Sequence, residues 1–474
     1  MSFASPMFLW YFMPAVLGAY WLLPARARNW VIAVASLLFY AWGAGSFVLL
    51  LLGCMVLNFA SGLAIDGGWL KARRRLRSAL LVATVGADLS ILVIWKYAGF
   101  GSTQLHHLFP DVPILHILLP IGISFFTFHH LSYVVDVYRG SRPAQRNPVQ
   151  FVTYIAMFPQ LIAGPIVRYH EISEQLAQSR AGQRLRDFAD GFPRFALGLA
   201  KKVIIADSIA PIANAVFGAP VDQLDWRTAW IGALAYTIQI YFDFSGYSDM
   251  AIGLAAMFGF TLPENFNRPY AALSITDFWR RWHMSLSRWF RDYVYIPLGG
   301  NRGSSMATYR NLFTVFVLTG FWHGAQWTFL VWGLFHGGML ALERLTGLAR
   351  IDATRWVAPR RILTLLAVIV GWVLFRADSL PHGLGILKIM AVPRFTGTSA
   401  VLIDAGIRNQ ALILLAFGLL VVFIPARFTM GRFLEDSRTR LAGAARLAYS
   451  VVAAPAAAIL VAAGTFSPFL YFQF

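Results

Sequence analysis

Cysteine is nearly absent from this chain, since Cys54 is the only one among 474 residues. A disulfide within the chain and a metal centre built on several cysteines are therefore excluded. Cys54 lies in an apolar run, where the simplest interpretation is a small buried hydrophobic side chain. The sequence also lacks metal-ligand spacings, a glycine-rich phosphate loop and a Gly-x-Ser-x-Gly elbow, so it gives no support to an internal serine nucleophile or to a metal site.

Charged residues are scarce as well, at 13% of the chain against 58% hydrophobic residues. Soluble domains carry roughly a quarter charged residues, so this composition indicates an integral membrane protein. Apolar runs recur along the whole length, and no polar stretch is long enough to form a separate soluble domain. The first residues lack the positive charge and cleavage site of a signal peptide, and we expect the first apolar run to remain as an anchor.

The basic residues outnumber the acidic ones and give a formal net charge of +18. They gather in short clusters between apolar runs, including 71–77, 139–146 and 344–361. Short loops rich in lysine and arginine stay on the cytoplasmic side and face anionic lipid. Nucleic-acid binding needs a contiguous basic face, which this pattern does not offer. We therefore expect the bilayer, and no nucleic acid, as the partner of these clusters.

A helix needs about 20 mostly apolar residues to cross the bilayer. The sequence predicts an all-α polytopic membrane protein with roughly ten to twelve transmembrane helices, and one run has room for two of them. We expect one membrane-embedded domain over 1–474, with a core at about 114–345 and C-terminal helices at about 360–474. The expected spans are 7–23, 29–43, 46–65, 79–98, 114–137, 190–206, 228–244, 310–345, 360–376, 409–425 and 447–464.

Two regions fit spanning helices poorly. Residues 151–169 contain Pro159 and Pro165, and residues 262–305 mix aromatic and charged side chains with several prolines and glycines. Irregular backbone at membrane depth is tolerated where protein or a water-filled cavity surrounds it. We therefore expect both regions to form re-entrant or interfacial elements around a central cavity.

His323 is the leading candidate for chemistry. It lies in an apolar run between Gly320 and Gly324, where a polar side chain is costly and a close approach is possible. A neutral imidazole there can act as a general base, although a histidine bonded between two helices would give the same pattern. On one continuous helix, His336 would lie roughly 20 Å away and on another face. We therefore assign His336 a structural role unless the helix breaks.

The segment 276–293 is unusually rich in arginine and tryptophan. If it is one helix, Trp279, His283, Leu286 and Phe290 share a face, and the arginines surround the other sides. An amphipathic interfacial helix anchored by tryptophan is one interpretation. Arginines that hold the phosphates of a carrier such as coenzyme A are another, because the guanidinium fork suits phosphate. The arginines concerned are Arg280, Arg281, Arg288 and Arg291.

Two carboxylates, Asp243 and Asp249, lie beside an apolar span. Six residues place them about 120° from a shared helix face, so the paired geometry of retaining glycosidases is unsupported. We expect them to pair with the arginines of the 276–293 segment or to orient a histidine. We expect Lys201 and Lys202 to mark a helix end by snorkelling.

The combined motifs closely resemble the membrane-bound O-acyltransferase superfamily, and within it the bacterial branch that acetylates exopolysaccharides. The resemblance extends almost from end to end. It is carried by Leu119–Phe125, Leu161–Ile166, Tyr241–Asp249, Glu264–Asn267, Phe278–Ser287, Arg291–Tyr293, Leu298–Gly303, Gly320–Ala325 and Ser467–Phe474.

The resemblance implies an O-acetyltransferase of the bacterial inner membrane that passes acetyl groups from cytoplasmic acetyl-CoA toward the periplasm. It implies no permanently bound cofactor, periplasmic SGNH-type acetyltransferases as partner proteins, and an exopolysaccharide, most simply alginate, as final acceptor. The family's membrane histidine maps to His323 and its second histidine to His283. His283 is then expected to position the acyl group or to stabilise developing negative charge. The donor phosphates are expected near Arg280, Arg281 and Arg288.

Other functions fit parts of the pattern. A sister enzyme could acylate cellulose, peptidoglycan or, with D-alanine, teichoic acid. A transporter or flippase could use the histidines as a proton relay, but internal repeats are not apparent in the sequence. A non-catalytic scaffold that recruits a periplasmic acetyltransferase is a further alternative.

Overall fold

The structure, a computed structural model, describes residues 2–177, 184–348, 355–393, 400–423 and 440–463. Within these ranges the regular secondary structure is entirely helical and no strand occurs, which confirms the predicted all-α class. The chain divides into two compact units, Met1–Phe195 with Ser248–Pro263 (the first unit) and Ala196–Tyr247 with Glu264–Phe474 (the second unit). Helices α10 (Arg184–Ala200) and α12 (Trp226–Met257) each contribute to both units.

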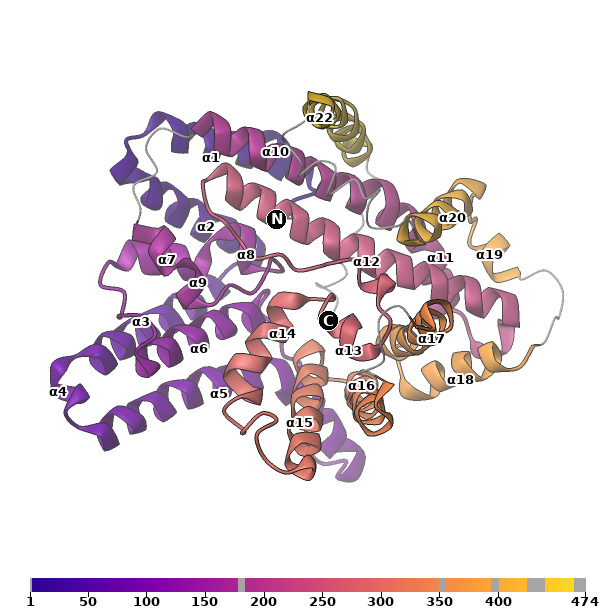
Figure 1. Cartoon of the computed structure of the whole chain (residues 1–474), viewed down its shortest axis with the longest axis horizontal. Helices are drawn as coiled ribbons and strands as arrows, with labels where there is room; N and C mark the ends of the chain where they lie inside the picture. The colour runs from indigo at the N-terminus through magenta and orange to yellow at the C-terminus, as the bar shows by residue number, and fades with distance from the viewer. Residues whose placement is uncertain (1, 178–183, 349–354, 394–399, 424–439, 464–474) are drawn as a thin grey trace. The chain divides into compact units, whose positions relative to one another are not determined.

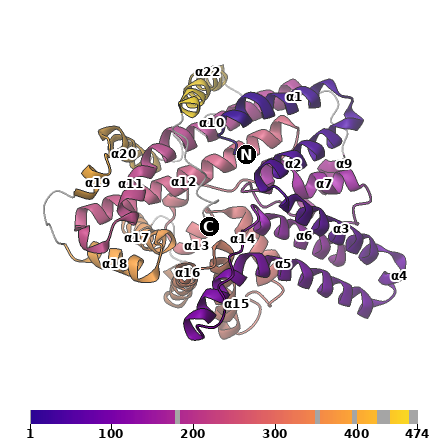
Figure 2. The same cartoon turned by 180° about the vertical axis from the view of Figure 1, so that it is seen from behind.

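The first unit is built largely from helices that precede α10. Helices α3, α5 and α6 lie side by side in both opposite views (Figure 1, Figure 2). Two buried polar contacts join α3 to α5: Asn58 donates to Asp88 at 2.9 Å, and Thr84 donates to Ser61 at 2.9 Å. The helices are α1 (Met13–Leu22), α2 (Arg28–Ala44), α3 (Phe47–Asp66), α4 (Gly68–Lys71), α5 (Arg74–Leu108), α6 (Ile123–Arg139), α7 (Pro148–Ala156), α8 (Phe158–Leu161) and α9 (Tyr169–Ala177).

The second unit holds most of the remaining helices. Helices α15 and α16 pack extensively against each other, which confirms the prediction that 310–345 contains two helices. Helix α18 was not among the predicted spans. Besides α10 and α12, the helices are α11 (Asp207–Gly218), α13 (Ile275–Trp279), α14 (Met284–Phe290), α15 (Ser305–His323), α16 (Trp327–Thr346), α17 (Val357–Arg376), α18 (Leu380–Ala391), α19 (Ala400–Asp404), α20 (Asn409–Phe423) and α22 (Arg440–Ala462).

Three helices of the described residues, α3, α5 and α17, are long and apolar enough to cross a membrane. The larger count of ten to twelve is not confirmed by helix length and composition. Several other apolar helices stop short, among them 8–22, 380–391 and 409–423. A helix of 17 residues spans only about 26 Å, less than the roughly 30 Å hydrocarbon layer.

Proline and glycine shape the irregular segments, as predicted. The expected span 114–137 begins late, at Ile123, because residues 109–122 are not helical and include Pro113 and Pro120. Gly122 has a φ of 76°, a backbone conformation that glycine adopts without strain. Residues 262–305 contain only short helices and turns, which confirms that no long helix forms there.

Several charged side chains inside the protein are paired with opposite charges. In the second unit Lys202 contacts Asp207 at 2.5 Å and Asp243 at 2.8 Å, and all three side chains are at most 5% exposed. The snorkelling interpretation of Lys202 is therefore wrong, because η3 (Lys201–Ala206) directs it at two carboxylates instead of toward the membrane surface. In the first unit Asp249 pairs with Arg194 at 2.6 Å. Both aspartates have structural partners, but these are not the arginines of 276–293.

Replacing Lys202 tests how much this buried triad contributes. We expect Lys202→Met to destabilise the protein by about 3–5 kcal/mol, because two buried carboxylates would lose their cation. The matched control is Lys71→Met, since Lys71 pairs with Asp66 at 2.7 Å but is 53% exposed. Its effect should stay below about 1 kcal/mol. Thermal unfolding in detergent, followed by the loss of the monodisperse chromatographic peak, compares the two, and equal losses would contradict the expectation.

Candidate active site

His283 occupies a sharp turn between two short helices. Its φ of 43° and ψ of 54° lie in the left-handed region, which costs a residue other than glycine about 1–3 kcal/mol. Helix α13 ends at Trp279 and α14 begins at Met284. The interpretation of 276–293 as one helix with His283 and Trp279 on a common face is therefore wrong. Strain of this kind is concentrated at functional sites.

A clamp between two chain segments holds the turn. The N–H of Met284 donates to the carbonyl of Asn265 at 2.9 Å, and the N–H of Asn267 donates to the carbonyl of Arg281 at 2.9 Å. The Asn265 side chain is fully buried. Its Oδ1 lies 3.1 Å from Nδ1 of His283 and accepts from the Ser285 hydroxyl at 2.9 Å. Backbone and side-chain contacts together therefore fix the position of the imidazole.

The two histidines predicted to be catalytic contact the same indole. Trp322 lies 6.0 Å from His283 and 5.0 Å from His323, measured between ring centroids. His283 also meets Phe244 edge-to-face at 4.7 Å. Burial lowers the pKa of His283 from its ordinary value to about 3, so this imidazole is neutral at physiological pH. The structure therefore brings His283 and His323 into one site.

His323 is the last residue of α15 and is only 6% exposed. The rings of Trp332 and Phe375 approach it edge-on, at 5.1 Å and 5.0 Å. The unpaired carbonyls at the C-terminus of a helix carry partial negative charge, which stabilises a cation in the last turn. An imidazolium formed at His323 is therefore stabilised by its place in the helix.

Helix α15 does break after His323, so α16 starts afresh at Trp327. His336 consequently lies near the middle of α16 and shares Trp332 with His323, at 5.0 Å. It also meets Trp279 at 5.1 Å. A Cβ at Gly371 would come within 2.6 Å of its Nε2, so the ring is tightly enclosed. The expected separation of His323 and His336 on one continuous helix is therefore wrong, because the helix breaks and both rings pack on Trp332. The structural role of His336, predicted for an unbroken helix, stays a prediction.

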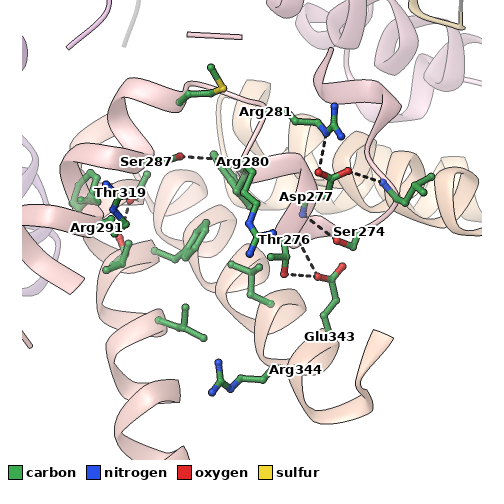
Figure 3. Close-up of a pocket in the computed structure, with 18 of the residues that line it drawn as sticks. Ser274, Thr276, Asp277, Arg280, Arg281, Ser287, Arg291, Thr319, Glu343 and Arg344 are labelled. Carbon is green, nitrogen blue, oxygen red and sulfur yellow. Dashed lines mark hydrogen bonds and ion pairs between the residues drawn. The ribbon is translucent and has the colours of Figure 1, made fainter. Parts of the chain in front are cut away.

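A pocket of about 1140 Å³ adjoins these residues in the second unit. Its wall brings together Arg280, Arg281 and Arg288, the three arginines predicted to bind the donor, and Figure 3 shows the first two beside Asp277 and Glu343. The volume is at the upper end of ordinary ligand sites, which span roughly 300–1,000 Å³. The other arginines of the wall are Arg291, Arg344, Arg360 and Arg361.

The two carboxylates of the pocket are already engaged. Asp277 pairs with Arg281 at 2.8 Å. Glu343 accepts hydrogen bonds from the N–H groups of Ile275 and Thr276 and from the Thr276 hydroxyl, and so caps α13 (Figure 3). In the part of the chain that the structure describes, Arg280 and Arg344 have no carboxylate partner. Seven arginines against two engaged carboxylates make the pocket strongly cationic.

Aromatic packing connects the pocket to His323. Trp279 lines the pocket and meets Trp332 at 5.6 Å, and Trp332 in turn meets His323. Two further residues of the wall, Met284 and Thr319, lie next to His283 in the chain and one turn before His323. His283 and His323 do not line the pocket themselves but lie behind its wall, next to lining residues or joined to them through Trp332.

Several residues of this site were missed by reasoning from the sequence. Arg344, Arg360 and Arg361 were assigned to loops that face lipid, yet they line the pocket. Glu343 and Asn265 were not singled out, although each organises the backbone of the site. The chain offers no local signal for either, because their partners lie 67 and 18 residues away.

Comparison with known proteins gives a consistent result. Residues 123–381 match the sequence profile of the membrane-bound O-acyltransferase family. The chain is 43% identical to the probable alginate O-acetylase of Azotobacter vinelandii, over the full length of both proteins. It is 47% identical to the corresponding Pseudomonas aeruginosa protein, over 80% of this chain and 73% of that one. It is 39% identical to the peptidoglycan O-acetyltransferase of Helicobacter pylori, over 82% of this chain and 79% of that one.

Close contact between α15 and α16 positions His323 and can be tested at two glycines of α16. A Cβ at Gly333 would collide with the carbonyl of Phe316, whereas a Cβ at Gly338 meets nothing within 4 Å. We expect Gly333→Ala to cost about 1–3 kcal/mol by overpacking and to lower activity. Gly338→Ala should be neutral or stabilise by up to about 1 kcal/mol, because alanine favours the helix. Thermal unfolding and activity of both variants provide the test, and a stable, fully active Gly333→Ala protein would contradict it.

Proposed function

Because the chain belongs to the membrane-bound O-acyltransferase family, we propose that it transfers acetyl groups from acetyl-CoA for O-acetylation of an exopolysaccharide. The cationic pocket beside His323 is the observation that carries the proposal. Alginate is the polymer that the most extensive similarity suggests. Peptidoglycan is the second candidate, supported by the Helicobacter pylori relative.

Coenzyme A suits the pocket chemically, since it carries a diphosphate and a further phosphate on its ribose. Arginine forks bind phosphate oxygens in pairs, and such charge-assisted contacts are about twice as strong as neutral ones. Arg280, Arg281 and Arg288 hold these phosphates, joined by Arg344, which has no carboxylate partner among the described residues. The acyl arm then extends past Trp279 toward His323.

The chemical step needs a base and a way to hold the thioester. His323 takes the proton of the acceptor hydroxyl while the hydroxyl oxygen attacks the thioester carbonyl. The carbon–sulfur bond then breaks, and the departing thiolate recovers that proton from the imidazolium. The C-terminus of α15 stabilises the imidazolium in between. His283 positions the acyl group, and no covalent acyl-enzyme is required.

The wider arrangement follows the same proposal. The protein acts as a single multi-pass domain of the bacterial inner membrane, with some ten to twelve crossings and its basic loops in the cytoplasm. Acetyl-CoA then enters from the side on which α17 begins, where Arg360 and Arg361 lie. SGNH-type acetyltransferases of the periplasm receive the acetyl group and pass it to the polymer.

Removing the base tests the proposed step. We expect His323→Ala to reduce polymer acetylation by roughly 10²–10⁴-fold, the usual contribution of general base catalysis. His107→Ala, at an exposed histidine of α5, is the control and should retain activity. Acetylation is measured in membranes that hold equal amounts of each protein. Full acetylation by the His323→Ala protein would refute the assignment of the base.

Donor binding is tested at the two arginines without a carboxylate partner. We expect Arg280→Gln with Arg344→Gln to raise the KM for acetyl-CoA at least tenfold, because each lost charged hydrogen bond is worth about 1.5–3 kcal/mol. Arg73→Gln is the control, since Arg73 is exposed and stacks on Trp69. Turnover of labelled acetyl-CoA by purified protein is the measurement. If the wild-type protein did not turn over acetyl-CoA, a transporter or a scaffold would be favoured instead.

A further inference from the structure

We propose that Asn265 fixes His283 as the tautomer protonated on Nδ1, so that its Nε2 accepts a hydrogen bond from an amide N–H of the donor's thioester arm. This inference rests on the proposed function and deepens it, because it assigns His283 a defined hydrogen-bonding role. It also distinguishes between the two roles that the sequence left open. In this scheme Asn265 is a positioning residue and His283 contacts the substrate.

The tautomer follows from one backbone contact. The N–H of Ser285 lies 3.2 Å from the terminal side-chain atom of Asn265 that also meets His283. A backbone N–H can only donate, so this atom must be the amide oxygen and not the nitrogen. The same oxygen lies 3.1 Å from Nδ1 of His283. An oxygen cannot donate here, so Nδ1 must carry the proton.

The other ring nitrogen is then left with a lone pair. Nε2 of His283 is buried and has no hydrogen-bond partner among the described residues. Leaving a buried acceptor unpaired is costly, so Nε2 is open to a hydrogen-bond donor that arrives with a ligand. A bare nitrogen repels an oxyanion, which excludes His283 in this form as the donor that stabilises developing negative charge.

Among the described residues, no charged side chain forms a hydrogen bond or an ion pair with the His283 ring. The elements packed on His283 are α12 through Phe244 and α15 through Trp322. The titratable groups next to these contacts are Asp243, which is paired with Lys202, and His323. Glu264 lies beside Asn265 in the chain, and Arg281 lies two residues before His283. Burial is the main influence on the pKa of His283, and it favours the neutral ring.

The chemistry of the two substrates identifies the group that meets Nε2. The proton of the acceptor hydroxyl goes to His323 in the proposed step, so it is not available. The pantetheine arm of coenzyme A carries amide N–H groups, the nearer one two carbons from the thioester sulfur. A hydrogen bond from that amide to Nε2 would hold the thioester beside His323, because both histidines contact Trp322.

The tautomer can be observed without any activity. Protein labelled with ¹⁵N in its histidine rings is compared with His283→Gln protein by solid-state NMR. We expect the signals lost in the variant to be those of a neutral ring with a protonated Nδ1 and a bare Nε2. If the two lost ¹⁵N signals instead showed the proton on Nε2, or a doubly protonated ring, the inference would be overturned whether or not the protein uses acetyl-CoA.

Asn265→Asp tests the role in catalysis. The carboxylate can accept every hydrogen bond that Oδ1 accepts, and Nδ2 of Asn265 has no partner in the described residues, so the exchange removes no contact. The new negative charge raises the pKa of His283, so its ring becomes protonated within about pH 4–6. Protonation places an N–H on Nε2. We therefore expect the KM for acetyl-CoA to rise about tenfold as the pH falls, while the wild-type KM stays flat.

The alternatives give different profiles. If His283 donated to an oxyanion, the Asn265→Asp protein would gain kcat as the pH falls, which would overturn the inference. If Asn265 were purely structural, the Asn265→Asp protein would lose the same share of activity at every pH. That outcome would also overturn the inference. Asn265→Ala should lose binding throughout this range, whereas Asn265→Asp should recover near wild-type KM at the alkaline end. If wild-type protein shows no acetyl-CoA turnover, the proposed function fails and the NMR result alone decides the tautomer.

Discussion

Polar groups inside an apolar protein must find partners, and the site of this protein depends on that constraint. Each break in a helix frees N–H and C=O groups, and at the starts of α13 and α14 the structure supplies specific partners for them. Glu343 meets the free N–H groups at the start of α13. Asn265 meets both the backbone and the imidazole at the start of α14. The irregular backbone around the histidines is therefore held by contacts from distant segments.

The sequence was sufficient for the features that depend on local pattern. Hydrophobic runs predicted the all-α class and the two helices within 310–345, and the prolines predicted the irregular 262–305 region. Partners were harder to predict, because ion pairs form between residues that the fold brings together. Lys202 was predicted to lie at a helix end, because its partner Asp243 is distant in the chain and the local sequence does not indicate the pairing. The number of transmembrane crossings also cannot be obtained from helix length, because several apolar helices are short.

The site was predicted in its parts but not in its geometry. His323, His283 and three arginines were identified as candidates, because clustered arginines and a lone histidine in an apolar run are visible in a sequence. The structure places the three arginines on one pocket wall and both histidines on one indole, while their roles stay predictions. The turn at His283 was missed, since its left-handed backbone depends on a clamp 18 residues away. Arg360 was assigned to lipid because charge alone does not tell a pocket from a membrane surface.

The ring packing around His323 has a consequence for the size of the acyl group. Trp322, Trp332 and Phe375 each lie within 5.1 Å of its imidazole, between centroids. Buried aromatic rings interdigitate at the density of a crystal, so they leave little free volume. Under the proposed function, an acyl chain much longer than acetyl would have to displace one of these rings. Phosphate recognition is the same for every acyl-CoA. Selectivity for the length of the acyl chain would therefore come from these three rings.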